Sequence, residues 1–425
     1  MNLLRYLFSV FYIIITFNSF AKEYEELLTE NYIYKNNIKT VILEQKGRNF
    51  SYPVIRLASK ESLVLSFDDV TESGGDYSFT IIHCTYDWKI SDLSENEYID
   101  GFYDSHINNY ESSFNTLKSY NHYEAEFPNE DIKPLISGNY ILLVFEDDDR
   151  ENLVLSRRLS VYEDKTNIDG KIIRSSLVEK MNTSQELEFN ITSNGIYDPL
   201  DRIKIVIGQG KRQDNLIYDI QPTFIEGNKL IYKEASKLIF EAGNEFNFFN
   251  CKNKKYVISG IESISYQAEL YKYFIIPEKV NEYAVYSGQQ DINGEFFITS
   301  DDGVNMQTDA DYVWVNFTLY RSSPELTGDY YVFGGLSDWR ISEDNKMIYN
   351  NKTSAYELQM LLKQGFYNYQ YVWAETQNSD INISKARGSH YQTENNYIIY
   401  CYYNEQGTLY DKLIGFKILN SQKKI

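Results

Sequence analysis

Residues that could carry chemistry are few and scattered in this sequence. The four histidines are His83, His106, His122 and His390, and their spacing matches no metal-ligand pattern. His83 and His122 fall in strand-like runs that could be neighbours, and a hydrogen-bonded structural histidine is favoured over a ligand or a base. No hydrolase, zinc-protease or phosphate-loop motif is present, and Gly208–Gly210 lacks the third glycine of a dinucleotide site. The sequence therefore predicts no catalytic residue, no cofactor and no metal.

Two groups of carboxylates are further candidates. The acidic run from Asp301 to Asp311 would suit a hard cation such as Ca²⁺, but its spacing is not that of an EF-hand and an ordinary acidic loop is favoured. A carboxylate pair such as Asp68-Asp69 could in principle serve glycoside hydrolysis. Adjacent residues of a strand point to opposite faces, however. We therefore predict only turn and surface acidity for this pair.

Two tryptophans are candidate sugar contacts. The Gly334–Trp339 turn and the Gly365–Tyr371 strand resemble the corresponding parts of early-set, glycogen-binding modules. That resemblance would let Trp339 and Trp373 stack on a glycan. Tyrosine and tryptophan also alternate on buried strands, so a supporting role inside a sandwich is the favoured interpretation.

The elements that would position these residues are strands. The chain holds 39 Tyr and 24 Phe, which favour pleated surfaces, and short alternating runs are separated by frequent turns. These features predict an all-β protein of tandem immunoglobulin-like or early-set β-sandwich domains. We expect an N-terminal sandwich at 22–164, a middle sandwich at 165–282 and a C-terminal sandwich at 283–425.

Residues 1–21 are expected to be a cleaved signal peptide. Arg5 precedes an apolar run, Tyr6 to Phe17, and Ser19 and Ala21 fill the small-residue positions of a cleavage site before Lys22. The run is shorter than the roughly 20 apolar residues of a spanning helix. We therefore expect export to the periplasm without direct membrane insertion.

Charge and cysteine content narrow the function classes further. The formal net charge is -20, which disfavours nucleic acid as a partner because phosphate backbones would be repelled. Cys84, Cys251 and Cys401 are odd in number and lack CxxC partners, so they predict no disulfide framework. We expect them to be buried as small hydrophobic residues, and a single disulfide bond between two of them is the alternative.

The most informative stretch is Tyr77–Asn129. Its first eight residues alternate as a strand, and more than thirty residues rich in aromatics follow before the next alternation begins near Tyr120. A connection of that length is usually functional or a packed loop. Its characteristic residues are His83, Asp87, Trp88, Tyr98, Phe102, Phe114, Asn115 and His122.

In these residues the stretch resembles the first domain of the type IX secretion system plug proteins of Bacteroidota. Segments near the C-terminus, such as Leu336–Trp339 and His390–Asn395, also fit that family. The resemblance implies a non-enzymatic periplasmic protein that associates with the outer membrane. Its partner would be the translocon β-barrel called SprA, whose periplasmic opening it would seal, and the residues of the stretch are candidate contacts. The alternative is a periplasmic or surface glycan-binding β-sandwich protein.

Overall fold

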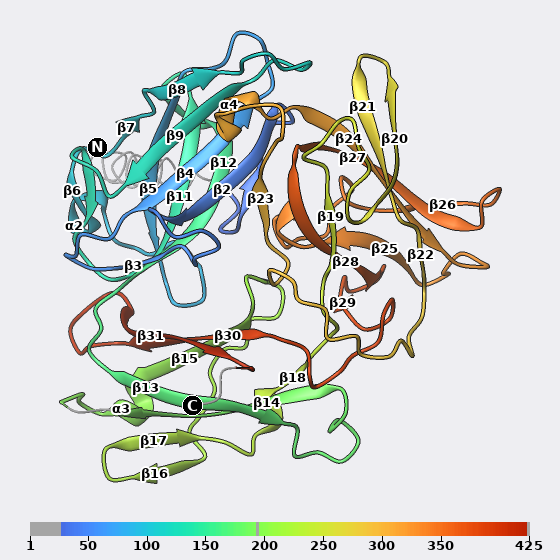
Figure 1. Ribbon diagram of the computed structural model, residues 1–425. Helices are drawn as coiled ribbons and strands as arrows, with labels where there is room; N and C mark the ends of the chain where they lie inside the picture. Colours follow the sequence, from blue (N-terminus) through green and yellow to red (C-terminus); the bar gives the residue numbers. More distant parts are fainter. Residues whose placement is uncertain (1–26, 193–194, 423–425) are drawn as a thin grey trace, which may run out of the picture.

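The computed structural model describes residues 27–192 and 195–422, so the expected signal peptide lies outside the described residues. Within those ranges the regular structure is almost entirely strand, as the alternating sequence predicts. The strands form three parts that lie against one another, coloured blue to teal, green with red, and yellow to orange in Figure 1. Across the described ranges, no helix is long and apolar enough to span a bilayer.

The first part is a sandwich of two sheets. One sheet is ordered β1-β12-β11-β5-β7, with β3 pairing β12, and the other is ordered β2-β4-β9-β8. Their apolar faces enclose one core that includes Phe67, Phe79, Tyr123 and Leu142. The strands are β1 (Tyr32–Ile33), β2 (Ile38–Gln45), β3 (Val54–Arg56), β4 (Leu63–Asp69), β5 (Tyr77–Cys84), β7 (Ser105–His106), β8 (Asn109–Ser112), β9 (Asn121–Phe127), β11 (Gly138–Glu146) and β12 (Asp149–Tyr162).

The long connection after β5 carries most of the small elements of this part. They are α2 (Glu95–Tyr98) and β6 (Ile99–Gly101), with β7 and β8 following, and β6 pairs with β10 (Ile132–Pro134). All eight residues of β5 are buried. One face packs on the sandwich core; on the other, the following turn covers Ile82 and Cys84, and residues 103–106 cover Ser78 and Thr80.

The second part is a sandwich that draws its strands from two distant stretches of the chain. One sheet is ordered β13-β14-β17-β16, with β18 pairing β14, and the other is β15-β30-β31. The elements are β13 (Asn167–Arg174), β14 (Ser184–Thr192), α3 (Pro199–Arg202), β15 (Ile203–Gln209), β16 (Phe224–Glu226), β17 (Lys229–Tyr232), η1 (Ser236–Leu238), β18 (Ile239–Glu241), β30 (Asn396–Tyr403) and β31 (Lys412–Asn420).

This pairing differs from the consecutive order that we expected. The last two strands, which we placed in the sandwich at 283–425, complete the second sandwich instead. Ile205 faces Cys401 and Ile207 faces Ile399 across β15 and β30, and all four side chains lie in the core of the second part. Alternation along residues 396–403 identifies a strand but carries no information about its partner. The pairing of this strand with β15 is therefore evident only in the structure.

The third part is therefore inserted between β18 and β30. It packs the sheet β19-β28-β23, with β25 and β29 pairing β28, against the sheet β20-β21-β24-β27-β26, with β22 pairing β24. The elements are β19 (Asn247–Asn250), β20 (Ile261–Gln267), β21 (Leu270–Ile275), β22 (Glu278–Lys279), β23 (Phe296–Ile298), α4 (Met306–Asp309), β24 (Tyr312–Tyr320), β25 (Gly328–Phe333), η2 (Gly335–Ser337), β26 (Ile348–Asn350), β27 (Ala355–Lys363), β28 (Gly365–Glu375) and β29 (Ile381–Asn382).

The cysteines have the role expected of small hydrophobic residues. Cys84, Cys251 and Cys401 are all buried and free, and each lies in a different part. No pair of them forms a bridge in the structure.

Candidate partner-contact surface

The turn after β5 is built around Trp88. The Trp88 backbone has a φ of 64°, and its N–H donates to the Thr85 carbonyl at 3.0 Å. The ring is only 8% exposed and packs with Ile82 and Ile141, while the Arg158 guanidinium lies 4.3 Å from the ring centroid. Trp88 therefore holds the turn onto the outer face of the sheet and is not available to a partner.

Asp87 also belongs to this turn. Its carboxylate accepts a hydrogen bond from the Thr85 hydroxyl at 2.5 Å and forms an ion pair with Lys89 at 2.6 Å. The carboxylate thus closes the turn through side chains.

His83 is fully buried on β5. Its Nδ1 lies 2.9 Å from the Ser91 hydroxyl, and burial lowers the pKa of His83 to about 4. A Cβ at Gly138 would approach His83 Nε2 within 2.5 Å, so the ring fills the space that this glycine leaves open. A neutral, enclosed imidazole of this kind supports the sheet and has no access to a substrate.

His122 lies on the other sheet of the sandwich, because β9 pairs with β4 and β8 whereas β5 pairs with β11 and β7. The two histidines are therefore not on neighbouring strands, contrary to the option we considered. Nδ1 of His122 is 2.6 Å from Asp68. Burial opposes its charge, but the hydrogen bond to Asp68 and the Glu124 carboxylate 3.7 Å from Nε2 outweigh burial and raise the pKa of His122.

Asp68 is the centre of a buried polar junction that the sequence did not reveal. Its carboxylate also accepts a hydrogen bond from the Tyr312 hydroxyl at 2.6 Å and one from Lys363 Nζ at 2.7 Å. Lys363 donates in addition to the Gln307 carbonyl. Asp68 and Lys363 are 0% and 1% exposed. This junction joins β4 and β9 of the first part to β24, β27 and α4 of the third part.

Our prediction of surface acidity for Asp68-Asp69 is wrong for both residues. Asp69 is also buried and accepts a hydrogen bond from the Tyr77 hydroxyl at 2.9 Å. The two carboxylates do point to opposite faces of β4, Asp69 into its own sandwich and Asp68 toward the third part. In the sequence, both carboxylates stand at the end of an apolar strand. A surface residue can stand in the same place, so this position does not distinguish a buried carboxylate from an exposed one.

The acidic run Asp301–Asp311 is occupied by protein partners. Asp311 accepts from the Leu117 N–H at 2.5 Å and pairs with Lys254 at 2.7 Å. Asp309 accepts from the N–H groups of Val304 and Asn305. Over the residues that the structure describes, no group of three or more acidic, histidine or cysteine side chains could hold a metal ion.

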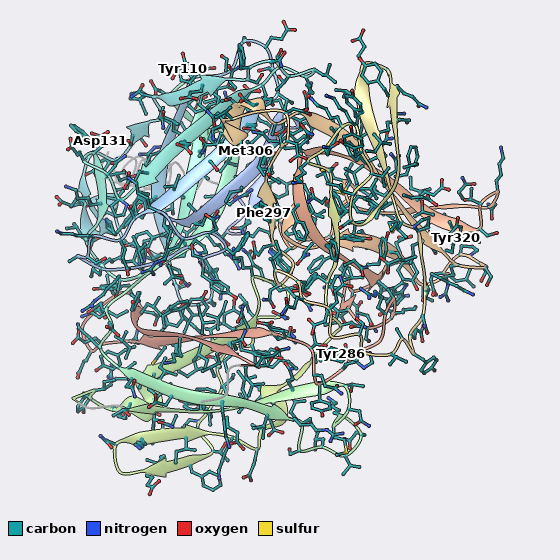
Figure 2. The ribbon with its side chains drawn as sticks, viewed as in Figure 1. Tyr110, Asp131, Tyr286, Phe297, Met306 and Tyr320 are labelled. Carbon is teal, nitrogen blue, oxygen red and sulfur yellow. The ribbon has the colours of Figure 1, made fainter. Side chains whose placement is uncertain are left out.

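The outer half of the long loop is exposed, in contrast to its inner half. Tyr98 is 5% exposed, whereas Phe102 is 70% and Phe114 is 73% exposed. Tyr103 and Tyr110 are exposed as well, and we call these four residues, Phe102, Tyr103, Tyr110 and Phe114, the outer aromatic group. Figure 2 shows Tyr110 over β8 and Asp131, whose carbonyl binds the Phe102 N–H, at the margin of the first part.

The backbone beneath the outer aromatic group is held in place. Phe102 donates to the Asp131 carbonyl at 2.7 Å and Phe114 to the Thr308 carbonyl at 3.0 Å. Gly101 has a φ of +111°, and a Cβ there would lie 2.1 Å from the Asp131 oxygen, so only glycine allows this approach. Asn115, next to Phe114, is exposed with a φ of 57°. Rings carried on an ordered backbone lose little entropy when a partner covers them.

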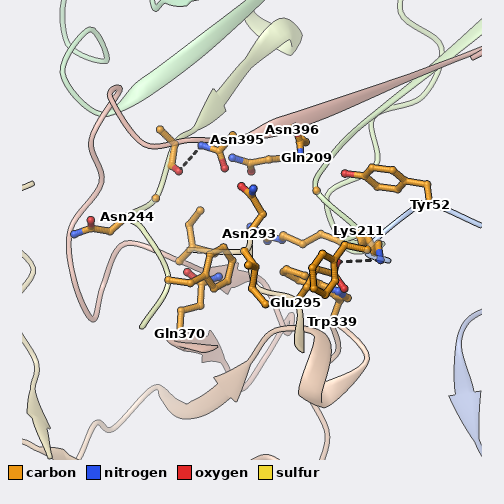
Figure 3. Close-up of a pocket in the computed structure, with 18 residues that line it drawn as sticks. Tyr52, Gln209, Lys211, Asn244, Asn293, Glu295, Trp339, Gln370, Asn395 and Asn396 are labelled. Carbon is orange, nitrogen blue, oxygen red and sulfur yellow. Dashed lines mark hydrogen bonds and ion pairs between the residues drawn. The ribbon is translucent and has the colours of Figure 1, made fainter. Parts of the chain in front are cut away.

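The two candidate sugar contacts are not brought together at one site. Trp339 is 6% exposed and makes edge contacts with Phe246 and Phe333. Trp373 lies half-buried on β28, and Lys385 Nζ covers one face of its ring at 3.5 Å. A cavity at the meeting point of the three parts, shown in Figure 3, includes Trp339 in its wall but not Trp373.

Comparisons with known proteins agree with the resemblance noted in the sequence. Residues 38–163 match the family model described as the type 9 secretion system plug protein 1st domain. A crystal structure described as a hypothetical protein from Parabacteroides merdae ATCC 43184 is 33% identical, covers 93% of this chain and 100% of its own, and superimposes with a TM-score of 0.90. No curated protein matches the chain.

Proposed function

The chain belongs to the type 9 secretion system plug protein family, and we propose on this basis that it is a non-enzymatic plug in the periplasm. The plug closes the periplasmic opening of the outer-membrane translocon barrel of that secretion system. The family match over the first part is the observation that carries this proposal. Large membrane barrels enclose an aqueous lumen, so a translocon without cargo leaks unless something closes it.

A plug works through shape and reversible affinity, and the contacts between the three parts support that role. Besides the Asp68 junction, Arg157 of the first part pairs with Asp338 of the third at 3.0 Å. The Tyr402 hydroxyl of the second part donates to Asn139 of the first at 2.8 Å. Each of the three groups Arg157, Asn139 and Tyr402 is buried. Buried, directional contacts of this kind fix the parts relative to one another.

We assign the contact with the barrel to the outer aromatic group. Exposed aromatic side chains that gather on one segment are the usual anchors of a protein interface. In this loop the buried residues Trp88 and Tyr98 hold the segment, and the exposed residues Phe102 and Phe114 are left free to bind. The net charge of -20 keeps the unbound plug soluble and away from anionic lipid.

A deletion strain and a tagged protein test the proposal together. Removing the protein is expected to sensitise cells to antibiotics too large for ordinary porins, and the tagged wild type is expected to recover the barrel from detergent-solubilised outer membranes. Secretion itself can continue, because a plug must leave before cargo passes. A deletion strain as impermeable as its parent, with no barrel recovered on the tag, would end the proposal.

Paired substitutions test the assigned surface. Phe102→Ser with Phe114→Ser should abolish recovery of the barrel and reproduce the leak of the deletion strain. The matched control is Tyr266→Ser with Tyr283→Ser, which removes two exposed rings of the third part (56% and 90% exposed). Equal loss in both double variants would show that the outer aromatic group is not the specific contact.

A further inference from the structure

The cavity at the meeting point of the three parts has a volume of about 170 Å³. Its wall is supplied by the β2–β3 loop of the first part, by the chain after β15 and after β18 in the second, and by residues before β23 and on β28 in the third. Figure 3 shows Asn293 near its centre, Gln370 and Trp339 below, and Tyr52 to one side. No residue of the outer aromatic group contributes to it.

Three polar side chains of this wall have no hydrogen-bond partner among the described residues, although Lys211 Nζ lies 5.8 Å from the centroid of the Tyr52 ring. Gln370 is 8% exposed, and its carboxamide makes no hydrogen bond to any residue in the described ranges. Neither do the Asn293 carboxamide and the Tyr52 hydroxyl within the same ranges. Gln370 is the buried one of the three, whereas Asn293 and Tyr52 are half-buried. Because buried polar groups are almost always hydrogen-bonded, the Gln370 carboxamide, with the two half-buried groups beside it, points to an occupant that hydrogen-bonds.

The charged groups of the wall are already neutralised. Lys211 Nζ lies 3.1 Å from Glu295, and Arg212 lies 2.5 Å from Asp214. An ion entering the cavity would find no free counter-charge and would lose its hydration, which is costly. The occupant is therefore neutral.

The remaining wall is aromatic. Trp339 and Phe246 meet edge to face with ring centroids 5.8 Å apart. Rings next to free carboxamides suit a molecule with an apolar face and hydroxyl groups at its edge, rather than water alone. The volume is below the roughly 300–1,000 Å³ of sites for drug-sized ligands, so the occupant is about as large as one sugar ring.

We propose that this cavity is a binding site for a neutral, polyhydroxylated molecule of single-sugar size. Its hydroxyl groups pair with Gln370, Asn293 and Tyr52, and its apolar face lies on Trp339 and Phe246. The proposal is independent of the plug function, since it rests on the cavity alone and survives if the protein does not bind a barrel.

Saturation-transfer NMR with the full-length mature protein tests it. The probes are methyl α-D-glucopyranoside and N-acetylglucosamine, with glucuronate as the charged comparator. Transfer to at least one neutral sugar, and much weaker transfer to glucuronate, is the expected result. Absence of transfer to both neutral sugars at millimolar concentration, or equal transfer to glucuronate, would overturn the proposal.

Substitutions then locate the binding. Gln370→Ala should weaken affinity about tenfold, the effect of one lost hydrogen bond, and Tyr52→Phe should weaken it while keeping the shape of the wall. Gln267→Ala, which removes an exposed carboxamide of the β20–β21 hairpin, is the control and should bind as the wild type does. Undiminished binding by both Gln370→Ala and Tyr52→Phe, with unchanged melting temperatures, would place the sugar elsewhere and refute the site.

Discussion

At the scale of single residues, the residues that carry the family resemblance are of two kinds. Some hold the first part together, and others face outward. Trp88 shows the first role. Trp88→Ala removes a ring enclosed by Ile82, Cys84, Ile141 and Leu143 and should lower the free energy of unfolding by about 3–5 kcal/mol. Urea denaturation followed by intrinsic fluorescence measures the loss.

The control for this prediction is Phe102→Ala. Its ring is 70% exposed, so the free energy of unfolding should change by less than about 0.5 kcal/mol. A Trp88→Ala protein as stable as Phe102→Ala would mean that the Trp88 ring does not lie inside the protein.

The pKa values of the two buried histidines of the first part should be shifted in opposite directions. Burial lowers the pKa of His83 from 6.5 to about 4, so the native state stays neutral where the unfolded chain takes up a proton. The stabilisation is complete above about pH 6.5 and is lost as the pH falls toward 4, an effect on the order of 3 kcal/mol. The pKa of His122 is raised, so its contribution is present below pH 6.5 and is lost as the pH rises through the raised value.

Selective labelling of histidine makes this measurable, because the chain has only four. Imidazole chemical shifts should show one ring that remains neutral to about pH 4 and another that remains protonated above pH 6.5. Two unshifted titrations near 6.5 would contradict both environments.

At the scale of elements, the junction between β4, β9 and β27 depends on a buried ion pair. Lys363→Met leaves the Asp68 carboxylate enclosed without its ammonium partner and should cost about 3–5 kcal/mol of the free energy of unfolding. Adding Asp68→Asn should recover part of this loss, because the uncompensated buried charge is gone.

A surface pair provides the comparison. Lys46 and Glu126 lie 2.6 Å apart with their side chains 61% and 40% exposed, so Lys46→Met should cost less than about 1 kcal/mol. The measurement is the denaturant midpoint of five proteins: the wild type, Lys363→Met, Asp68→Asn, the double variant and Lys46→Met. Strictly additive effects of Asp68→Asn and Lys363→Met would show that the pair is not coupled.

At the scale of the whole molecule, the second part depends on the end of the chain. A fragment of residues 165–282 contains β13 to β22 but lacks β30, which pairs with β15, and β31, which pairs with β30. Its apolar side chains would be left in water, so the fragment should be unfolded or aggregated by circular dichroism and size-exclusion chromatography.

The complementary fragment should fold. Residues 165–245 joined by a glycine-serine linker to residues 394–422 restore both sheets, and should show a strand spectrum and a cooperative melt. A well-folded 165–282 fragment would instead support the consecutive order of domains that the sequence analysis predicted.

The sequence by itself determined the local features of this protein. Alternation, aromatic content and turn residues identified an all-β chain, and the order of residues from His83 to His122 identified its family. These signals are local, because side-chain periodicity follows from the geometry of one strand. Burial of the three cysteines was also expected, because a free cysteine behaves as a small hydrophobic residue.

Only the tertiary structure decided which strands meet and which polar groups are enclosed. β30 and β31 belong to the second part because β30 pairs with β15, nearly 200 residues earlier in the chain. Alternation identifies a strand but does not indicate its partner. Asp68 was expected at the surface because the residues that cover it, Tyr312 and Lys363, belong to another part of the chain. The cavity around Gln370 could not be predicted from the sequence either, because its wall comes from segments that meet only after all three parts have folded.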